Sequence, residues 1–96
     1  MSSHETKDQT NKDQNVEITI VTPQGKWENA VFKKTAKIQE VIDAVVQHFN
    51  FVKNGNYQLR LERDPNKPLK PEDRTLVSFG IKDGDALRFT DLGGGV

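Results

Sequence analysis

The spacing of apolar residues changes period twice along the chain, and this limits the folds that the chain can adopt. Residues 16–21 alternate with a period of two, which is typical of a half-buried strand. Apolar residues then recur at three- and four-residue steps over residues 38–49, the period of an amphipathic helix. Alternation returns in residues 57–62 and 86–90. One amphipathic helix is therefore available to cover one face of a sheet.

The first two apolar segments are predicted to form a β-hairpin. Residues 22–26 supply the turn, because proline presets φ and glycine permits a positive φ. Residues 27–32 form the second strand. Its two candidate faces are Trp27, Asn29 and Val31 on one side and Glu28, Ala30 and Phe32 on the other. Alternation leaves open which face is buried.

The helix is predicted to begin after Thr35, whose hydroxyl would cap its first turn. The apolar stripe consists of Ile38, Val41, Ile42, Val45 and Phe49. We expect the helix to end near Asn50, before a loop at residues 54–56. His48 lies in the last turn, and we interpret it as a structural or surface residue, because the sequence offers no cysteine partner and no serine–acid arrangement.

The segment between the third and last strands is predicted to be irregular. Residues 64–68 should form a turn, and Leu69 should anchor a very short edge strand. Residues 71–74 could open a helical turn, because proline is tolerated in the first turn of a helix. The predicted core anchors that follow are Leu76, Phe79 and Ile81. A tight turn at Asp83-Gly84 leads into the last strand.

This order of elements, ββαβ(β)β, predicts the fold class. The strands beside the helix connection must lie parallel in the middle of a mixed sheet. In the last strand, Leu87 and Phe89 should point inward. We therefore expect an α+β roll in which a mixed four- to five-stranded sheet packs on one helix.

Composition excludes several kinds of site and partner. The chain has no cysteine, which excludes disulfides, thiolate metal sites and a cysteine nucleophile. Its formal net charge is zero, from 14 basic and 14 acidic residues, so no global field favours nucleic acid or acidic lipid. There is no long apolar run and no N-terminal apolar leader. We expect a cytoplasmic monomer that binds neither nucleic acid nor membrane and needs no metal or cofactor.

The two ends of the chain are predicted to lie outside a folded domain at residues 16–90. Residues 1–15 contain no apolar side chain after Met1 and predict a disordered tail. Residues 91–96 read Asp91-Leu92-Gly93-Gly94-Gly95-Val96. Glycine loses more backbone entropy on ordering than any other residue, so we expect a flexible tail.

A run before the last strand carries a family resemblance. Residues 75–87 (TLVSFGIKDGDAL) contain Thr-Leu, an aromatic residue, isoleucine and a turn in an order that resembles the ubiquitin-like β-grasp family. The resemblance spans residues 16–95 and includes the glycines. The polar leader looks like that of the small-ubiquitin-related modifiers. With its Gly-Gly-Gly-Val end and no cysteine, the chain is most similar to ubiquitin-like proteins of bacterial conjugation-type operons.

The resemblance implies a protein modifier rather than an enzyme. An activating enzyme would adenylate the carboxylate of Gly95, and a conjugating enzyme would pass the acyl group to amines of target proteins. Val96 follows Gly95, so a tail-processing peptidase would have to remove it first. Gly94 is the alternative acyl donor. Asp91, Leu92 and Gly93 would be recognised by these enzymes, although Asp91 stands where the tail of ubiquitin is basic.

Two other functions use the same fold. A sulfur carrier would hold a thiocarboxylate on the terminal glycine, and a non-conjugated β-grasp module would only bind other proteins. The resemblance also places Arg60, Arg88 and Thr90 on the sheet surface that is apolar in ubiquitin. We therefore expect receptors of ubiquitin to bind this chain poorly.

Overall fold

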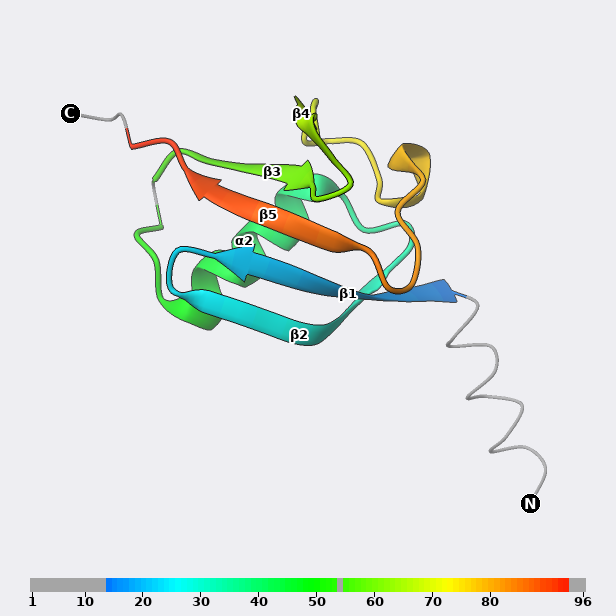
Figure 1. The fold of residues 1–96 in the computed structure, drawn as a ribbon, viewed down its shortest axis with the longest axis horizontal. Helices are drawn as coiled ribbons and strands as arrows, with labels where there is room; N and C mark the ends of the chain where they lie inside the picture. Colours follow the sequence, from blue (N-terminus) through cyan, green and yellow to red (C-terminus); the bar gives the residue numbers. More distant parts are fainter. Residues whose placement is uncertain (1–13, 54, 94–96) are drawn as a thin grey trace, which may run out of the picture.

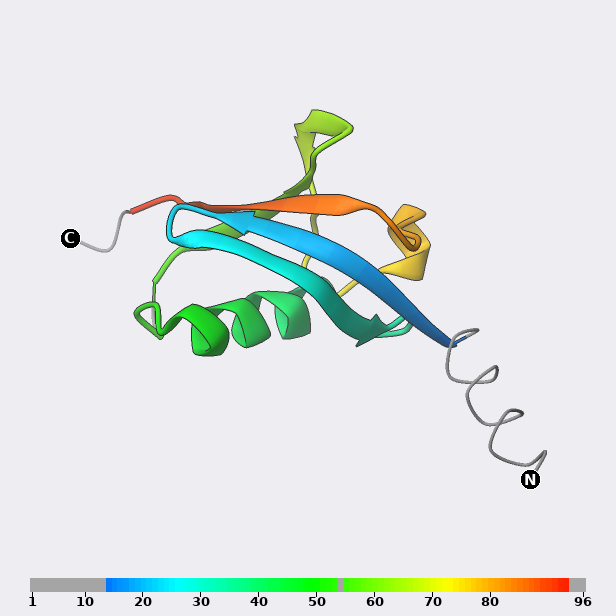
Figure 2. The same ribbon diagram turned by 60° about the horizontal axis from the view of Figure 1, so that its bottom comes forward.

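Five strands form one mixed sheet, and an α-helix covers one of its faces (Figures 1 and 2). This computed structural model describes residues 14–53 and 55–93. The elements are β1 (Asn15–Thr22), β2 (Gly25–Lys33), α2 (Ile38–Phe49), β3 (Tyr57–Leu61), β4 (Asp64–Pro68), the 3-10 helix η1 (Val77–Phe79) and β5 (Ala86–Asp91). The strand order is β2-β1-β5-β3-β4. Strands β1 and β5 are parallel and the other pairs are antiparallel, which confirms the predicted α+β roll.

A β-bulge in β2 decides which side chains of that strand face the core. The register pairs Ile18 with Ala30 but Ile20 with Trp27, so β2 holds one extra residue between these pairs. Asn29 lies in this interval with φ 59°, a left-handed conformation that asparagine tolerates better than most residues. Trp27 and Ala30 therefore share the core face. Their grouping on opposite faces by simple alternation is wrong, because the bulge breaks the period of two.

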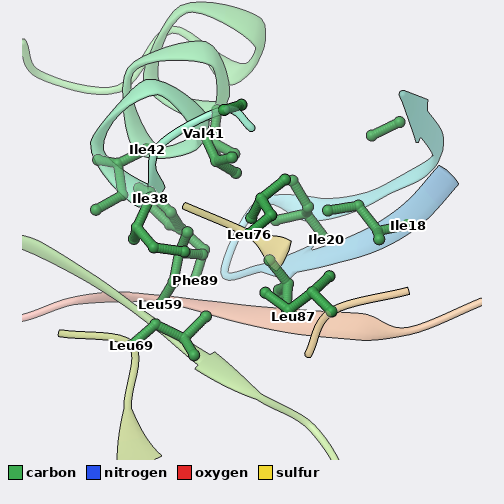
Figure 3. Packing of buried hydrophobic residues seen from close by; sticks show 14 of the residues in the cluster. Ile18, Ile20, Ile38, Val41, Ile42, Leu59, Leu69, Leu76, Leu87 and Phe89 are labelled. Carbon is green, nitrogen blue, oxygen red and sulfur yellow. The ribbon is translucent and has the colours of Figure 1, made fainter. Parts of the chain in front are cut away.

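The core lies between the sheet and α2 (Figure 3). The buried helix residues are Ile38, Val41, Ile42, Val45 and Val46. They face strand residues such as Ile20, Leu59 and Phe89, each at most 2% exposed. Phe49 is half-buried at the margin of this core. The helix ends at Phe49, next to the predicted end near Asn50, and its C-cap residue Asn50 adopts φ 61°.

Helix α2 begins two residues later than the Thr35 cap predicts. The residue at the N-cap position is Lys37, and the chain segment before η1 supplies acceptors for the first turn. The two bonds run from the N–H of Ile38 to the carbonyl of Arg74 (3.0 Å) and from the N–H of Gln39 to the carbonyl of Glu72 (2.9 Å). The predicted Thr35 cap is wrong, because tertiary hydrogen bonds satisfy donors that a hydroxyl usually satisfies.

Residues 64–68 form an edge strand rather than the predicted turn. Pro65 and Pro68 are compatible with β4 because this strand lies at the edge of the sheet. Leu69 is buried directly after β4, and its N–H donates to the carbonyl of Leu59 (2.8 Å). The predicted helical opening at residues 71–74 is a turn, and the helical turn occurs later, at η1.

The domain limits shift slightly from those predicted. Asn15, assigned to the leader, is the first residue of β1 and pairs with Lys33. The carbonyl of Gln14 accepts a hydrogen bond from the N–H of Lys34 (2.8 Å). Residues 1–13 lie outside the described residues, so the predicted disorder of the leader stays a prediction.

An ion pair fixes the start of β5. The Arg63 guanidinium donates to both carboxylate oxygens of Asp85, at 3.2 and 3.3 Å, and the backbone N–H of Lys82 donates to Asp85 Oδ2 at 3.0 Å. Burial of Asp85 opposes its ionisation, but these hydrogen bonds outweigh burial and lower the pKa of the Asp85 carboxyl. The same contact raises the pKa of Arg63.

Replacing Leu76 should show how much the segment before β5 contributes to the core. Leu76 has no exposed surface, so Leu76→Ala should lower the free energy of unfolding by about 2–5 kcal/mol. The neighbouring Val77 is 52% exposed, and Val77→Ala should change the free energy of unfolding by less than about 0.5 kcal/mol. Urea unfolding of both variants checks this. Equal losses would mean that Leu76 is not part of the core.

The Asp85 ion pair should make stability depend on acid pH. In the folded chain the pKa of Asp85 is lowered, so the unfolded chain takes up the proton first as pH falls. The stabilisation is present above about pH 4, the range of an unfolded carboxyl, and is lost as pH falls through the folded pKa. Unfolding free energies at a series of pH values should show the gap between wild type and Asp85→Asn narrowing below about pH 4. The exposed Asp73→Asn is the control for loss of a surface carboxylate, and at neutral pH it should change the free energy of unfolding by less than about 0.5 kcal/mol.

Candidate functional site

Strand β5 carries the chain from the middle of the sheet to the predicted tail. Asp91 is the last residue of β5 and pairs with Tyr57 of β3. The N–H of Leu92 then donates to the carbonyl of Asn56 (2.8 Å). The sequence predicts that Asp91 and Leu92 belong to a flexible tail. In the structure Asp91 pairs with β3, and Leu92 is hydrogen-bonded to Asn56, the residue before β3.

The chain turns immediately after this last contact. The N–H of Gly93 donates to the Asp91 carboxylate at 2.8 Å, which is an Asx-type bond spanning two residues. Gly93 has φ 66°, a conformation that glycine adopts without strain. A Cβ at Gly93 would meet nothing within 4 Å, so the backbone conformation rather than lack of space favours glycine there. Sequence reasoning missed this role of Asp91, although the two-residue Asp–Gly spacing signals it.

The structure places only part of the predicted acyl-donor site. It brings Asp91, Leu92 and Gly93 together at one end of the sheet, all three exposed. Gly94, Gly95 and Val96 lie outside the described residues. The turn between β1 and β2 and the loop after α2 lie at this same end (Figure 1).

A hollow beside the exit of the tail was not predicted. Its volume is about 520 Å³. It is lined by Pro23, Gln24, Asn50, Phe51, Val52, Tyr57, Asp91 and Gly93, and we call these residues together with Leu92 the tail collar. Val52 is 72% exposed and Leu92 43% exposed, so the collar presents apolar surface to solvent.

Two aromatic residues of the collar pack against the buried ring of Phe89 in β5. The ring of Phe51 stacks on Phe89 of β5, with centroids 5.0 Å apart, and Tyr57 stacks on the same ring at 4.9 Å. The hydroxyl of Tyr57 donates to the carbonyl of Val52 at 2.7 Å. The loop after α2 is thereby tied to the two strands that border the tail.

The open face of the sheet is polar, as predicted from Arg60, Arg88 and Thr90. Arg60 of β3 lies opposite Arg88 of β5, and Thr90 lies opposite Gln58. Each arginine has its own acceptor. Arg60 donates to Gln58 Oε1 (3.1 Å) and to the Pro65 carbonyl (2.8 Å), and Arg88 pairs with Glu62 at 2.9 Å. These partners offset the repulsion between two like charges placed directly opposite each other.

His48 packs against an aromatic side chain at the surface of the protein. The exposed imidazole of His48 stacks on the Trp27 indole, with centroids 4.0 Å apart and an angle of 6° between the rings. This contact agrees with the interpretation of His48 as a surface residue with a packing role. Residues 14–53 and 55–93 contain no group of three or more potential metal-ligating side chains. No helix there is long and apolar enough to cross a membrane.

Several solved structures share this fold. The ubiquitin-like domain of an Arabidopsis thaliana protein superimposes with a TM-score of 0.70 and 14% identity, over 86% of this chain and 83% of that one. A protein designed on the basis of ubiquitin superimposes with a TM-score of 0.68 and 20% identity, over 85% of this chain and 94% of that one. The ubiquitin-like domain of yeast Ddi1 superimposes with a TM-score of 0.65 and 15% identity, over 86% of this chain and 95% of that one. At such identities the likeness shows the fold alone.

Sequence comparison supplies the family. Among curated proteins, no sequence matches this chain. The family model of the UBX domain matches residues 10–87, which is most of the chain. The ubiquitin-like β-grasp resemblance is thus confirmed, whereas similarity to proteins of bacterial conjugation operons stays a prediction. The chain belongs to the UBX domain family, a family of ubiquitin-like domains.

Proposed function

We propose that this chain is a ubiquitin-like protein modifier that donates the carboxyl group of Gly95. The observation that supports the proposal is the course of β5, a central strand that leads directly into Leu92, Gly93 and the glycines that follow. A rigid domain with a side-chain-poor extension suits an acyl donor, because an enzyme can hold the domain and thread the extension.

The proposed chemistry resides in partner enzymes. A peptidase first hydrolyses the Gly95–Val96 bond with one water molecule and exposes the Gly95 carboxylate. A carboxylate oxygen then attacks the α-phosphate of ATP, and pyrophosphate leaves. The thiolate of an activating enzyme displaces AMP to form a thioester, and a conjugating enzyme takes over the acyl group by thiol exchange. An amine of the target protein finally displaces the thiol and forms an amide bond.

The residues of this chain have supporting roles in that sequence. The chain has no cysteine, so both thioesters must form on partner thiols. The glycines from Gly93 onward lack the Cβ atoms that would obstruct a narrow channel. The enzymes would contact Asp91 and Leu92 at the entrance to that channel. We propose further that the chain acts in the cytoplasm as a monomer, without nucleic acid or membrane.

A second function is favoured by the family itself. The ubiquitin-like fold and the UBX match support an interaction module, and this family is generally non-enzymatic. A module of this kind would bind partner proteins through its surface and would leave the glycines unused. The two functions therefore differ in one testable respect, the fate of Gly95.

Replacing Gly95 should separate the two functions. A tagged full chain expressed in its own cells should lose Val96 and form adducts that resist reducing agents. Gly95→Trp should abolish these adducts, because an indole cannot enter a channel built for glycine. The melting temperature should stay within about 1 °C of the wild type, as the predicted flexible tail requires. Reducing gels, intact mass and thermal unfolding provide the three measurements.

The other outcomes identify the alternatives. A mature chain that still ends in Val96 and forms no adduct would contradict the acyl-donor function and leave the interaction module. A chain that ends in Gly95 and carries one sulfur in place of a carboxyl oxygen would indicate a sulfur carrier. Adducts that persist in Gly95→Trp but vanish in Gly94→Trp would move the reactive carboxyl to Gly94.

A further inference from the structure

The position of Gly93 limits the distance between the folded domain and the active site of an enzyme that acts on Gly95. Only two residues separate Gly93 from the end of Gly95. A fully extended chain spans at most about 3.6 Å per residue, so the carboxyl group lies within about 7 Å of Gly93 in any conformation. An active site that encloses this carboxyl must therefore reach the end of the sheet and cover the surface around Gly93.

The surface at that end is the tail collar. Four large apolar side chains are prominently exposed in the described residues, namely Val31, Val52, Val77 and Leu92. Val52 and Leu92 belong to the collar. Val52 lines the hollow, and Leu92 lies in the chain between Asp91 and Gly93, which also line it. Val31 and Val77 line two other hollows that share Val16 and Asp83, away from the exit of the tail. Exposed apolar surface therefore coincides with the place that a tail-binding enzyme has to cover.

The collar is also held in position before any partner arrives. The Tyr57 hydroxyl binds the Val52 carbonyl, and the N–H of Phe51 donates to the carbonyl of Val46 (2.9 Å). Gly55 lies against the ring of Tyr57 so closely that any Cβ there would collide with the ring. A surface that needs little ordering loses less free energy on binding.

The charge of the collar indicates the chemistry of its partner. Asp91 is the ionisable acid among the residues that line the hollow, and its other lining residues carry no formal charge at neutral pH. Asp91 is exposed, and one of its oxygens accepts the Gly93 N–H. A guanidinium or ammonium group is the complement of such a carboxylate.

We infer that the tail collar is the docking surface for the enzyme that activates Gly95. The enzyme contacts Val52 and Leu92 with apolar side chains and pairs an arginine or lysine with Asp91. This inference rests on the proposed function, because it names the surface by which the acyl donor is recognised. Specificity then depends on the folded domain as well as on the glycines.

A charge introduced at Val52 tests the apolar contact. Purified chains ending at Gly95 are mixed with ATP and a soluble extract of the source cells, and the initial rate of the reductant-sensitive thioester is followed on non-reducing gels. Val52→Asp should slow thioester formation roughly tenfold or more, the effect of losing one important interface contact. Val77→Asp is the matched control, an exposed valine outside the collar, and should stay within about twofold of the wild type. Thermal unfolding verifies that both variants fold.

Asp91→Asn tests the charge separately from the turn. The amide oxygen can still accept the Gly93 N–H, so the backbone stays in place while the charge is removed. Thioester formation should fall about tenfold, and the remaining rate should depend less on salt concentration than that of the wild type.

The outcomes distinguish this inference from the proposed function. Absence of any thioester with the wild-type chain would overturn both. A wild-type chain that reacts while Val52→Asp and Asp91→Asn react equally fast would overturn the collar alone. Equal slowing of Val52→Asp and Val77→Asp would also overturn it, because the effect would not be confined to the exit of the tail.

Discussion

The parallel pairing of β1 with β5 is the contact on which the rest of this structure depends. It joins the first and last strands of the domain at the centre of the sheet, with Ile20 opposite Leu87. The N–H of Thr19 donates to the carbonyl of Asp85 at 3.1 Å, next to the ion pair with Arg63. Because β5 also pairs with β3, both of its edges are hydrogen-bonded to neighbouring strands. The tail consequently leaves from a central strand whose direction is fixed by the core.

The segment between β4 and β5 closes the end of this core and sets the start of the helix. Its own side chains Leu76 and Ile81 are buried, and its backbone carbonyls accept the first N–H groups of α2. The helix therefore begins where a distant segment meets it rather than where a local cap would place it. This dependence explains why Thr35 is a good cap by sequence and yet lies outside the helix.

Sequence periodicity could predict the elements that are stabilised by their own amphipathic pattern. The stripe through Val41 and Val45 identifies α2, and the alternation of Val16, Ile18 and Ile20 identifies β1. The bulge at Asn29 and the proline-bounded β4 could not be predicted, since both depend on register with a neighbouring strand. The glycines indicate the tail, but the collar joins Val52 to Leu92 from distant parts of the chain, and only the folded sheet brings them to one end.

The open face of the sheet and the tail collar differ in charge and in apolar character. On the open face, Arg60 and Arg88 are hydrogen-bonded or ion-paired to neighbours, and that face is polar and positively charged in its middle. The collar at the end of the sheet combines the exposed apolar side chains Val52 and Leu92 with one negative charge at Asp91. An enzyme that holds the tail has to cover the collar, because two residues are too short to reach past it. The open face lies outside the collar, so a protein bound there would not compete with the proposed activating enzyme for the same residues.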